Sequence, residues 1–140
     1  MPNLRIETNV SRDQVKDMST CLAELSKAVS ASTGKPEQYV CVQIITDVPM
    51  MFGGTDGPCA SAFFNSIGKV SAVANTQFLL NYFFFSQIGA EENKGHAAAI
   101  CPIVNKYLGV AEDRMYILFN DASYQNMGWK GTTFAAILGK

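Results

Sequence analysis

Two segments that follow the expected helices of this chain are alike, and this repeat restricts the fold more than any other feature. Residues 34–40 read GKPEQYV, and residues 109–115 read GVAEDRM. Each begins with a glycine, which suits the left-handed end of a helix, and leads through a turn toward a strand. The match predicts a duplicated strand–helix–strand unit, with a chance likeness over so short a segment as the alternative.

Local patterns predict the first of the two units. Residues 3–8 alternate polar and apolar side chains, as in a half-buried strand. Ser11 and Gln14 are typical of a capping box, so an amphipathic helix is expected to begin there and to end at Gly34. Residues 39–45 have the composition of a strand. The apolar positions of the helix are Val15, Met18, Leu22, Leu25 and Val29.

The second unit repeats this order with a strand at 59–67, a helix at 90–108 that ends at Gly109, and a strand at 115–119. Pro102 lies within the helix and should bend or weaken it. Right-handed crossovers make the two strands of each unit parallel. We therefore expect an α/β (α+β) fold in which two β-α-β repeats form a four-stranded mixed sheet with two helices on one face.

Such a sheet has one face without helices, and its edges need pairing. Symmetric association of several copies would meet both needs. The closing segment, residues 128–135, is too short to form a layer of its own and could pair with a neighbouring subunit. The pattern therefore favours an oligomer.

The composition excludes several classes of partner. The 140 residues suit a single domain spanning 1–140. Eleven basic and twelve acidic residues nearly balance, so we expect no nucleic acid partner. No apolar run reaches the roughly 20 residues of a spanning helix, so no membrane partner is expected. The first residues lack the pattern of a signal peptide, which favours a cytoplasmic location.

The four cysteines are Cys21, Cys41, Cys59 and Cys101, and they lie far apart without the spacing of a zinc site or a redox pair. We expect reduced, mostly buried thiols and no metal site. The single histidine, His96, has no partner carboxylate pattern and is expected to be a surface or packing residue.

Pro2 follows the initiator methionine and begins the first predicted strand. Removal of Met1 would leave a secondary amine at the start of this strand. A free α-amine titrates near ~8, and apolar surroundings disfavour its charged form, so a buried Pro2 nitrogen would be a neutral base near neutral pH. Pro2 is therefore a candidate catalytic residue; the alternative is that it only permits removal of Met1.

A series of short motifs extends along nearly the whole chain. The motifs are Met1-Pro2, TGKP at 33–36, FGG at 52–54, PCA at 58–60, SIGK at 66–69, DRMYI at 113–117, GW at 128–129 and FA at 134–135. In this order they resemble the macrophage migration inhibitory factor family.

The resemblance implies a homotrimeric, tautomerase-type barrel with sites between neighbouring subunits. It implies cofactor-independent keto–enol tautomerisation of a small aromatic keto acid such as phenylpyruvate, or of a dopachrome-like substrate. It also implies cytokine-like activity, secretion by a non-classical route and a cell-surface receptor of the invariant-chain type. The alternatives are a secreted signalling protein with vestigial catalysis and an inactive isoform.

The resemblance also implies roles for individual residues. Pro2 would shuttle the proton, Lys35 would meet the substrate carboxylate, and the backbone N–H of Ile67 would contact the substrate. Without the resemblance, Lys35 is expected to be a solvated residue after a helix, and Tyr116 and Trp129 are expected to be core residues. The residues expected to line the site are Tyr39, Tyr116, Leu118, Met127, Trp129 and Phe134.

Two departures from the family limit the expected chemistry. Leu118 stands where the best-known mammalian member has a polar asparagine, so one substrate hydrogen bond is lost and the preferred ring could differ. Cys59 stands at the first position of the mammalian C-x-x-C motif, but Ala62 replaces the second cysteine. We therefore expect no thiol oxidoreductase activity.

A third departure is the uncharged segment 70–87, VSAVANTQFLLNYFFFSQ. Without it, residues 68–69 would join residues 88–90 as GKIGA, which restores the family pattern. One hypothesis is a retained intron, because the two ends of the segment can be encoded by typical splice donor and acceptor sequences. The other is a true insertion that packs over the trimer or serves as an interaction loop, close enough to Ile67 to disturb the site.

Overall fold

The computed structural model describes residues 1–67 and 88–139, so the predicted insertion at 70–87 lies outside the described residues. Two strand–helix–strand units and a short closing segment make up the fold. The elements are β1 (Asn3–Thr8), α1 (Met18–Thr33), β2 (Cys41–Ile45), β3 (Ala60–Ile67), α3 (Ala90–Leu108), β4 (Met115–Ala122), β5 (Gly128–Trp129), β6 (Thr132–Thr133) and α4 (Phe134–Ile137).

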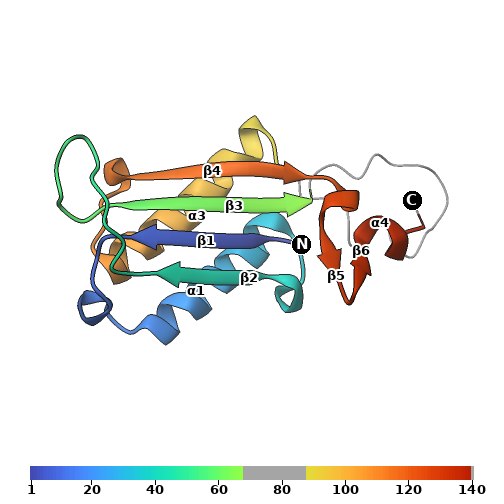
Figure 1. The fold of residues 1–140 in the computed structure, drawn as a ribbon, viewed down its shortest axis with the longest axis horizontal. Helices are drawn as coiled ribbons and strands as arrows, with labels where there is room; N and C mark the ends of the chain where they lie inside the picture. Colours follow the sequence, from blue (N-terminus) through green and yellow to red (C-terminus); the bar gives the residue numbers. More distant parts are fainter. Residues whose placement is uncertain (68–87, 140) are drawn as a thin grey trace.

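The four long strands form one mixed sheet in the order β2-β1-β3-β4. The strands of each unit are parallel, and β1 and β3 meet antiparallel at the centre of the sheet. Figure 1 shows α1 and α3 side by side behind the sheet, while its other face carries no helix among the described residues. This arrangement confirms the expected mixed sheet with both helices on one face.

The duplicated helix exits are also confirmed. Gly34 and Gly109 both adopt left-handed backbone, with φ of 65° and 69°. A 3₁₀ turn follows each glycine, at Glu37–Tyr39 in the first unit and Glu112–Arg114 in the second. The first turn corrects the expected strand at 39–45, because Tyr39 belongs to the turn and β2 begins at Cys41.

The predicted start of the first helix was wrong. The Ser11 and Gln14 capping box is present, but it closes a 3₁₀ turn at Arg12–Gln14 rather than an α-helix. Val15 is extended and buried, so the chain enters the core before the helix begins. Asp17 then caps α1 by accepting a hydrogen bond from the Thr20 backbone N–H at 3.1 Å. The buried stripe of α1 consists of Cys21, Leu25, Val29 and Thr33.

The second helix spans residues 90–108 as predicted and continues beyond Pro102, which is exposed. The proline therefore does not end the helix, although it has no backbone N–H to donate within it. The last strand is longer than expected: β4 extends past Phe119 to Ala122.

A single core fills the space between the sheet and its two helices. His96 belongs to this core, because it is buried against the rings of Phe64 and Phe119 and its Nδ1 lies 3.0 Å from the Ser32 hydroxyl oxygen. It is thus a packing residue and not a surface one. The largest apolar members of the core are Leu4, Ile6, Leu25, Val29, Phe64, Ile100 and Val104.

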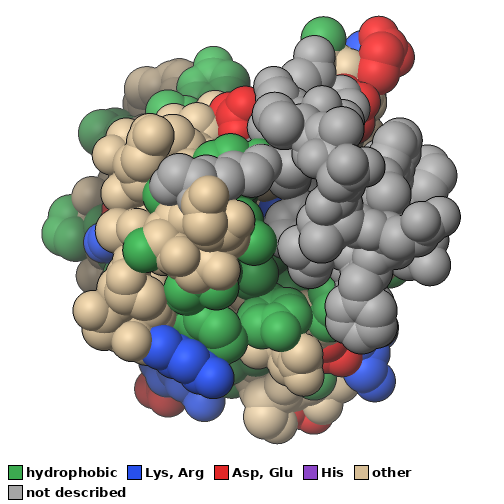
Figure 2. Space-filling model, turned by 90° about the vertical axis from the view of Figure 1, so that its right-hand side faces the viewer, with side chains coloured by type: hydrophobic (Ala, Val, Ile, Leu, Met, Phe, Trp, Pro, Cys, Tyr) green, Lys and Arg blue, Asp and Glu red, His purple; other side chains and the backbone are tan. Residues whose placement is uncertain are grey.

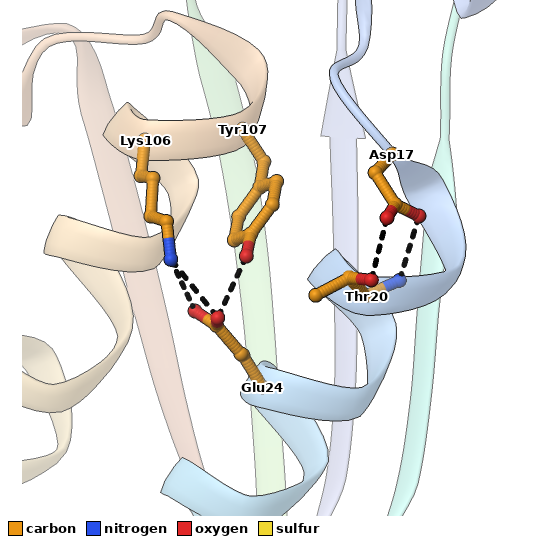
Figure 3. A network of polar contacts seen from close by, with 5 residues as sticks. All are labelled: Asp17, Thr20, Glu24, Lys106 and Tyr107. Atoms are coloured by element: carbon orange, nitrogen blue, oxygen red, sulfur yellow. Dashed lines mark hydrogen bonds and ion pairs between the residues drawn. The ribbon is translucent and has the colours of Figure 1, made fainter.

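A polar contact joins the outer sides of the two helices (Figure 3). The Glu24 carboxylate of α1 accepts a hydrogen bond from the Tyr107 hydroxyl at 2.6 Å and one from the Lys106 ammonium at 2.9 Å. These bonds hold the pKa of Glu24 below its ordinary value and raise that of Tyr107. The contact fixes α3 against α1 where the second unit meets the first.

All four cysteines are free thiols, as expected. Cys21 and Cys59 are buried and Cys101 is half-buried, but Cys41 is exposed at the edge strand β2, so it departs from the expected burial. Within residues 1–67 and 88–139, no helix combines the length and apolar character needed to cross a membrane.

Candidate active site

The beginning of the chain is held at one end of the sheet. Asn3 pairs with Cys41 of β2 on one side and with Asn65 of β3 on the other, so β1 begins between these two strands. Pro2 is fully buried, and its carbonyl oxygen accepts a hydrogen bond from the Cys41 N–H at 3.0 Å. The candidate catalytic residue is therefore fixed by its neighbours.

Lys35 lies beside the chain start because Gly34 turns the chain back toward the sheet at the end of α1. Only 6% of Lys35 is exposed. Its ammonium donates hydrogen bonds to the Ser66 Oγ at 2.8 Å and to the Ile67 carbonyl oxygen at 2.7 Å. The interpretation of Lys35 as a solvated residue was thus wrong, and the structure brings it together with Pro2 and Ile67.

Where Lys35 meets the start of the chain, the surroundings lower the pKa values of both amines. Burial, and then the positive charge of Lys35, lower the pKa of the α-amine on Met1 to about 4. Burial also lowers the pKa of Lys35 to about 8, while a hydrogen bond to the α-amine and the Asp121 carboxylate oppose this change. A nitrogen held here loses its proton more easily than a solvated one, which suits a base.

An aromatic cluster lies next to the chain start. The Trp129 ring stacks on Phe134 with centroids 5.8 Å apart, and it meets Tyr39 edge-on at 5.7 Å. Met127 joins the cluster through its carbonyl oxygen, which accepts from the Phe134 N–H at 3.0 Å. Trp129 remains 39% exposed, so it is not a core residue. The closing β5, β6 and α4 thus bring four of the predicted lining residues together.

This end of the molecule has an apolar surface. Figure 1 places β5, β6 and α4 beside the amino terminus. Figure 2 views the same end and shows hydrophobic side chains gathered near the middle of the part not drawn in grey, with both basic and acidic side chains toward the rim. Such an apolar surface suits a flat aromatic group.

Tyr116 and Leu118 do not join this group within one chain. Tyr116 pairs with Ser61 near the start of β3, whereas Ile67 ends that strand and pairs with Ala122. Ser61 and Ile67 are roughly 20 Å apart along an extended strand, farther than a small aromatic acid can reach. The two predicted residues instead lie on the helix-free face, 68% and 51% exposed, so Tyr116 is not a core residue either.

Three residues that contact or act on the predicted site residues were not predicted from the sequence. Ser66 and Asp121 act on Lys35, the first by a hydrogen bond and the second through its charge. Phe52 packs against Tyr116 with ring centroids 4.8 Å apart. Ser66 and Phe52 lie within the SIGK and FGG motifs. The alternation of the predicted strand places Ser66 on the buried side, and this position could have indicated a contact with the site. No sequence pattern indicated Asp121, because it lies beyond the predicted end of the last strand.

The side chains at this corner do not form a metal-binding cluster. In the part of the chain that the structure describes, no three His, Cys, Asp or Glu side chains gather so that they could hold a metal ion. The basic groups that the corner offers for proton transfer are the amines of the chain start and of Lys35.

Comparisons with known proteins agree on one family. The family model described as macrophage migration inhibitory factor (MIF) matches residues 1–87 and 80–135. Macrophage migration inhibitory factor of Xenopus laevis is 37% identical over 135 residues, which cover 96% of this chain and 100% of the relative. The Mus musculus protein of the same name is 34% identical over the same shares.

The fold is similar to solved structures as well. The structure of macrophage migration inhibitory factor from Trichinella spiralis matches with a TM-score of 0.76 at 30% identity. This match covers 94% of the present chain and 98% of the other.

Proposed function

This chain belongs to the macrophage migration inhibitory factor family, and we propose that it is a cofactor-independent keto–enol tautomerase with Pro2 as its acid and base. The observation that carries the proposal is the buried Pro2 beside Lys35, at a place where the α-amine of the preceding Met1 has a strongly lowered pKa. The proposed substrates are small aromatic keto acids such as phenylpyruvate, or dopachrome-like compounds.

The proton transfer begins once Met1 is removed, which leaves a secondary amine on Pro2. In its neutral form this amine takes a proton from the carbon next to the keto group, and the electron pair moves onto the carbonyl oxygen. The protonated amine then returns the proton to that oxygen, which completes the enol. Burial and the charge of Lys35 disfavour the protonated α-amine of Met1, and we expect the same surroundings to disfavour a protonated Pro2 amine once Met1 is removed.

Lys35 and the end of β3 orient the substrate. The ammonium of Lys35 meets the carboxylate of the keto acid, and the backbone N–H of Ile67 donates a hydrogen bond to the substrate. The cluster of Tyr39, Trp129 and Phe134 supplies an apolar wall for the ring. Binding thus requires an anionic group and a flat apolar group on the same small molecule.

A second copy of the chain completes the site. Tyr116 lies near the far end of the sheet and Leu118 near its middle, both on the helix-free face, so we expect them to reach a substrate at a neighbouring subunit. A homotrimeric ring covers these faces and brings the far end of one sheet to the Pro2 corner of the next. The exposure of these two side chains supports such an assembly.

The experiment that tests the proposal is phenylpyruvate turnover by the full chain after mass spectrometry has established that Met1 is absent. Pro2→Gly is expected to lower kcat/KM by about a hundredfold, because its primary amine lacks the ring that fixes the basic nitrogen beside Lys35. Circular dichroism and assembly mass should stay unchanged in this variant. Turnover that is undiminished in Pro2→Gly would overturn the proposal.

A second candidate function is cytokine-like signalling through a cell-surface receptor, with the tautomerase site acting mainly as a binding site. The names of the relatives favour it, because they describe inhibition of macrophage migration. The cytoplasmic location and the non-classical secretion stay predictions. In a macrophage migration assay, signalling that persists in Pro2→Gly would separate this function from turnover.

The third possibility, an inactive isoform, concerns the segment outside the described residues. A chain without residues 70–87, assayed beside the full chain, distinguishes it. Turnover in the shortened chain alone would assign the loss to the insertion, whereas turnover in both would exclude this interpretation.

A further inference from the structure

Ser66 occupies an unusual position for a hydroxyl. The alternating positions of β3 that face the helices hold Ala60, Ala62 and Phe64 and then Ser66, which is 1% exposed. A hydroxyl buried in an apolar row costs stability unless it finds a hydrogen-bond partner. The partner here is the ammonium of Lys35, at 2.8 Å.

The hydrogen bonds of this ammonium can be counted. An ammonium has three N–H donors and no acceptor. One N–H donates to the Ser66 Oγ and one to the Ile67 carbonyl oxygen. The third contacts the α-amine of Met1, and removal of Met1 would free it. Two acceptors at the end of β3 therefore aim the remaining donor at the place where the proposed chemistry occurs.

We propose that Ser66 is a positioning residue: it holds the Lys35 ammonium so that a single N–H is presented to the substrate carboxylate. This inference rests on the proposed tautomerase function. Lys35 then makes a one-point contact with one carboxylate oxygen, because its other two donors are bound to the protein. Ser66 acts through Lys35 and need not touch the substrate.

The effect of the Ser66 hydroxyl on Lys35 can be separated from the effect of the charged groups nearby. The Asp121 carboxylate acts on Lys35 through its charge, and it remains when the Ser66 hydroxyl is removed. Ser66→Ala deletes only the acceptor, so it withdraws a hydrogen bond that favours the charged form of Lys35. Ser66→Thr keeps the hydroxyl at the same position.

The test uses the full chain with Met1 removed and lysines carrying ¹³C at Cε. The Lys35 signal is assigned by its loss in Lys35→Arg and is followed by NMR through a pH titration. In Ser66→Ala the midpoint of Lys35 is expected to fall by about one pH unit. With phenylpyruvate at neutral pH, KM should rise about tenfold while kcat changes less than about twofold. Ser66→Thr should restore both values.

Thr8→Val is the matched control. Thr8 is buried on β1 near the opposite end of the sheet, and its hydroxyl donates to the Cys59 carbonyl oxygen at 2.7 Å. The same hydroxyl accepts a hydrogen bond from the Val10 N–H at 3.2 Å. This variant therefore loses two buried hydrogen bonds, but it should leave both the Lys35 titration and KM unchanged. Equal effects in Thr8→Val and Ser66→Ala would reduce the role of Ser66 to stability and overturn the proposal.

An unmoved Lys35 titration in Ser66→Ala would also overturn the positioning role, as would a moved titration with an unchanged KM. The titration needs no turnover. If the wild-type protein leaves phenylpyruvate unchanged, that result counts against the proposed function, and the titration still decides whether Ser66 holds Lys35.

Discussion

At the scale of single residues, Lys35 shows what sequence alone can and cannot predict. A lysine after a helix is usually solvated, so its own pattern pointed away from a site. Its burial arises from contacts with Ser66 and Ile67, which lie more than thirty positions away along the chain. Only the family resemblance placed it near Pro2, and no local pattern could have done so.

The titration of Lys35 leads to a pH prediction. Its pKa of about 8 means that the ammonium is charged below that pH and neutral above it. Turnover of a carboxylate substrate should therefore fall as pH rises through about 8, because kcat/KM loses the carboxylate contact. On the acidic side, kcat/KM should fall as the Pro2 amine gains its proton.

The measurement is a pH profile of kcat/KM for phenylpyruvate beside its methyl ester, which lacks the negative charge. The ester should keep the acidic limb and lose the basic one. A basic limb of equal size for both compounds would show that Lys35 does not bind the carboxylate.

At the scale of elements, the sequence predicted helices and strands well where a pattern was local. The helix at 90–108 is confirmed to the residue, because its apolar period and its terminal glycine agree. The start of α1 was wrong because the same capping signal also closes a 3₁₀ turn. The buried side chain of Val15, a tertiary contact, decides between the two outcomes.

Two glycines of the second helix give opposite expectations for the same substitution. Gly95 lies within α3 with open space where a Cβ atom would project, so Gly95→Ala should raise the free energy of unfolding by about 1 kcal/mol. Gly109 has equal space but a φ of 69°, so Gly109→Ala should lower it by about 1 kcal/mol.

Urea denaturation at one fixed protein concentration measures both changes, since assembly makes stability depend on concentration. The two variants serve as controls for each other, because each adds the same methyl group. If both variants lose stability, the room for a methyl group, and not the backbone conformation, would determine the effect of the substitution.

At the scale of the whole molecule, the sequence pattern predicted the sheet and its open face, and the family resemblance implied sites between neighbouring subunits. One chain holds Pro2 and Tyr116 at opposite ends of the sheet, and the division of the site between chains stays a prediction. No residue pattern reveals this division, because it depends on the register between β3 and β4.

Mixing two impaired variants tests the division. Pro2→Gly lacks the ring-held secondary amine proposed as the base, and Tyr116→Ala lacks the aromatic ring proposed to reach the site from the far end of the sheet. If each site combines Pro2 of one copy with Tyr116 of the next, equal mixing should restore about a quarter of the sites, because each copy meets a complementary neighbour at random.

The activity is measured after joint refolding, with separately refolded proteins as the control. The restored fraction is compared with the wild-type rate, and Tyr116→Ala alone sets the background. A mixture no more active than the sum of its components would place the whole site within one chain.

The likeness of the two halves has a last consequence, which concerns evolution. Gly34 and Gly109 end their helices in the same way, yet the next residue is the buried Lys35 in one half and the buried Val110 in the other. The second half begins in the middle of the chain, where every backbone nitrogen is an amide without a basic lone pair. A polypeptide has one amino terminus, so a duplicated fold carries one such amine, and the proposed role of the buried lysine is confined to the half that holds it.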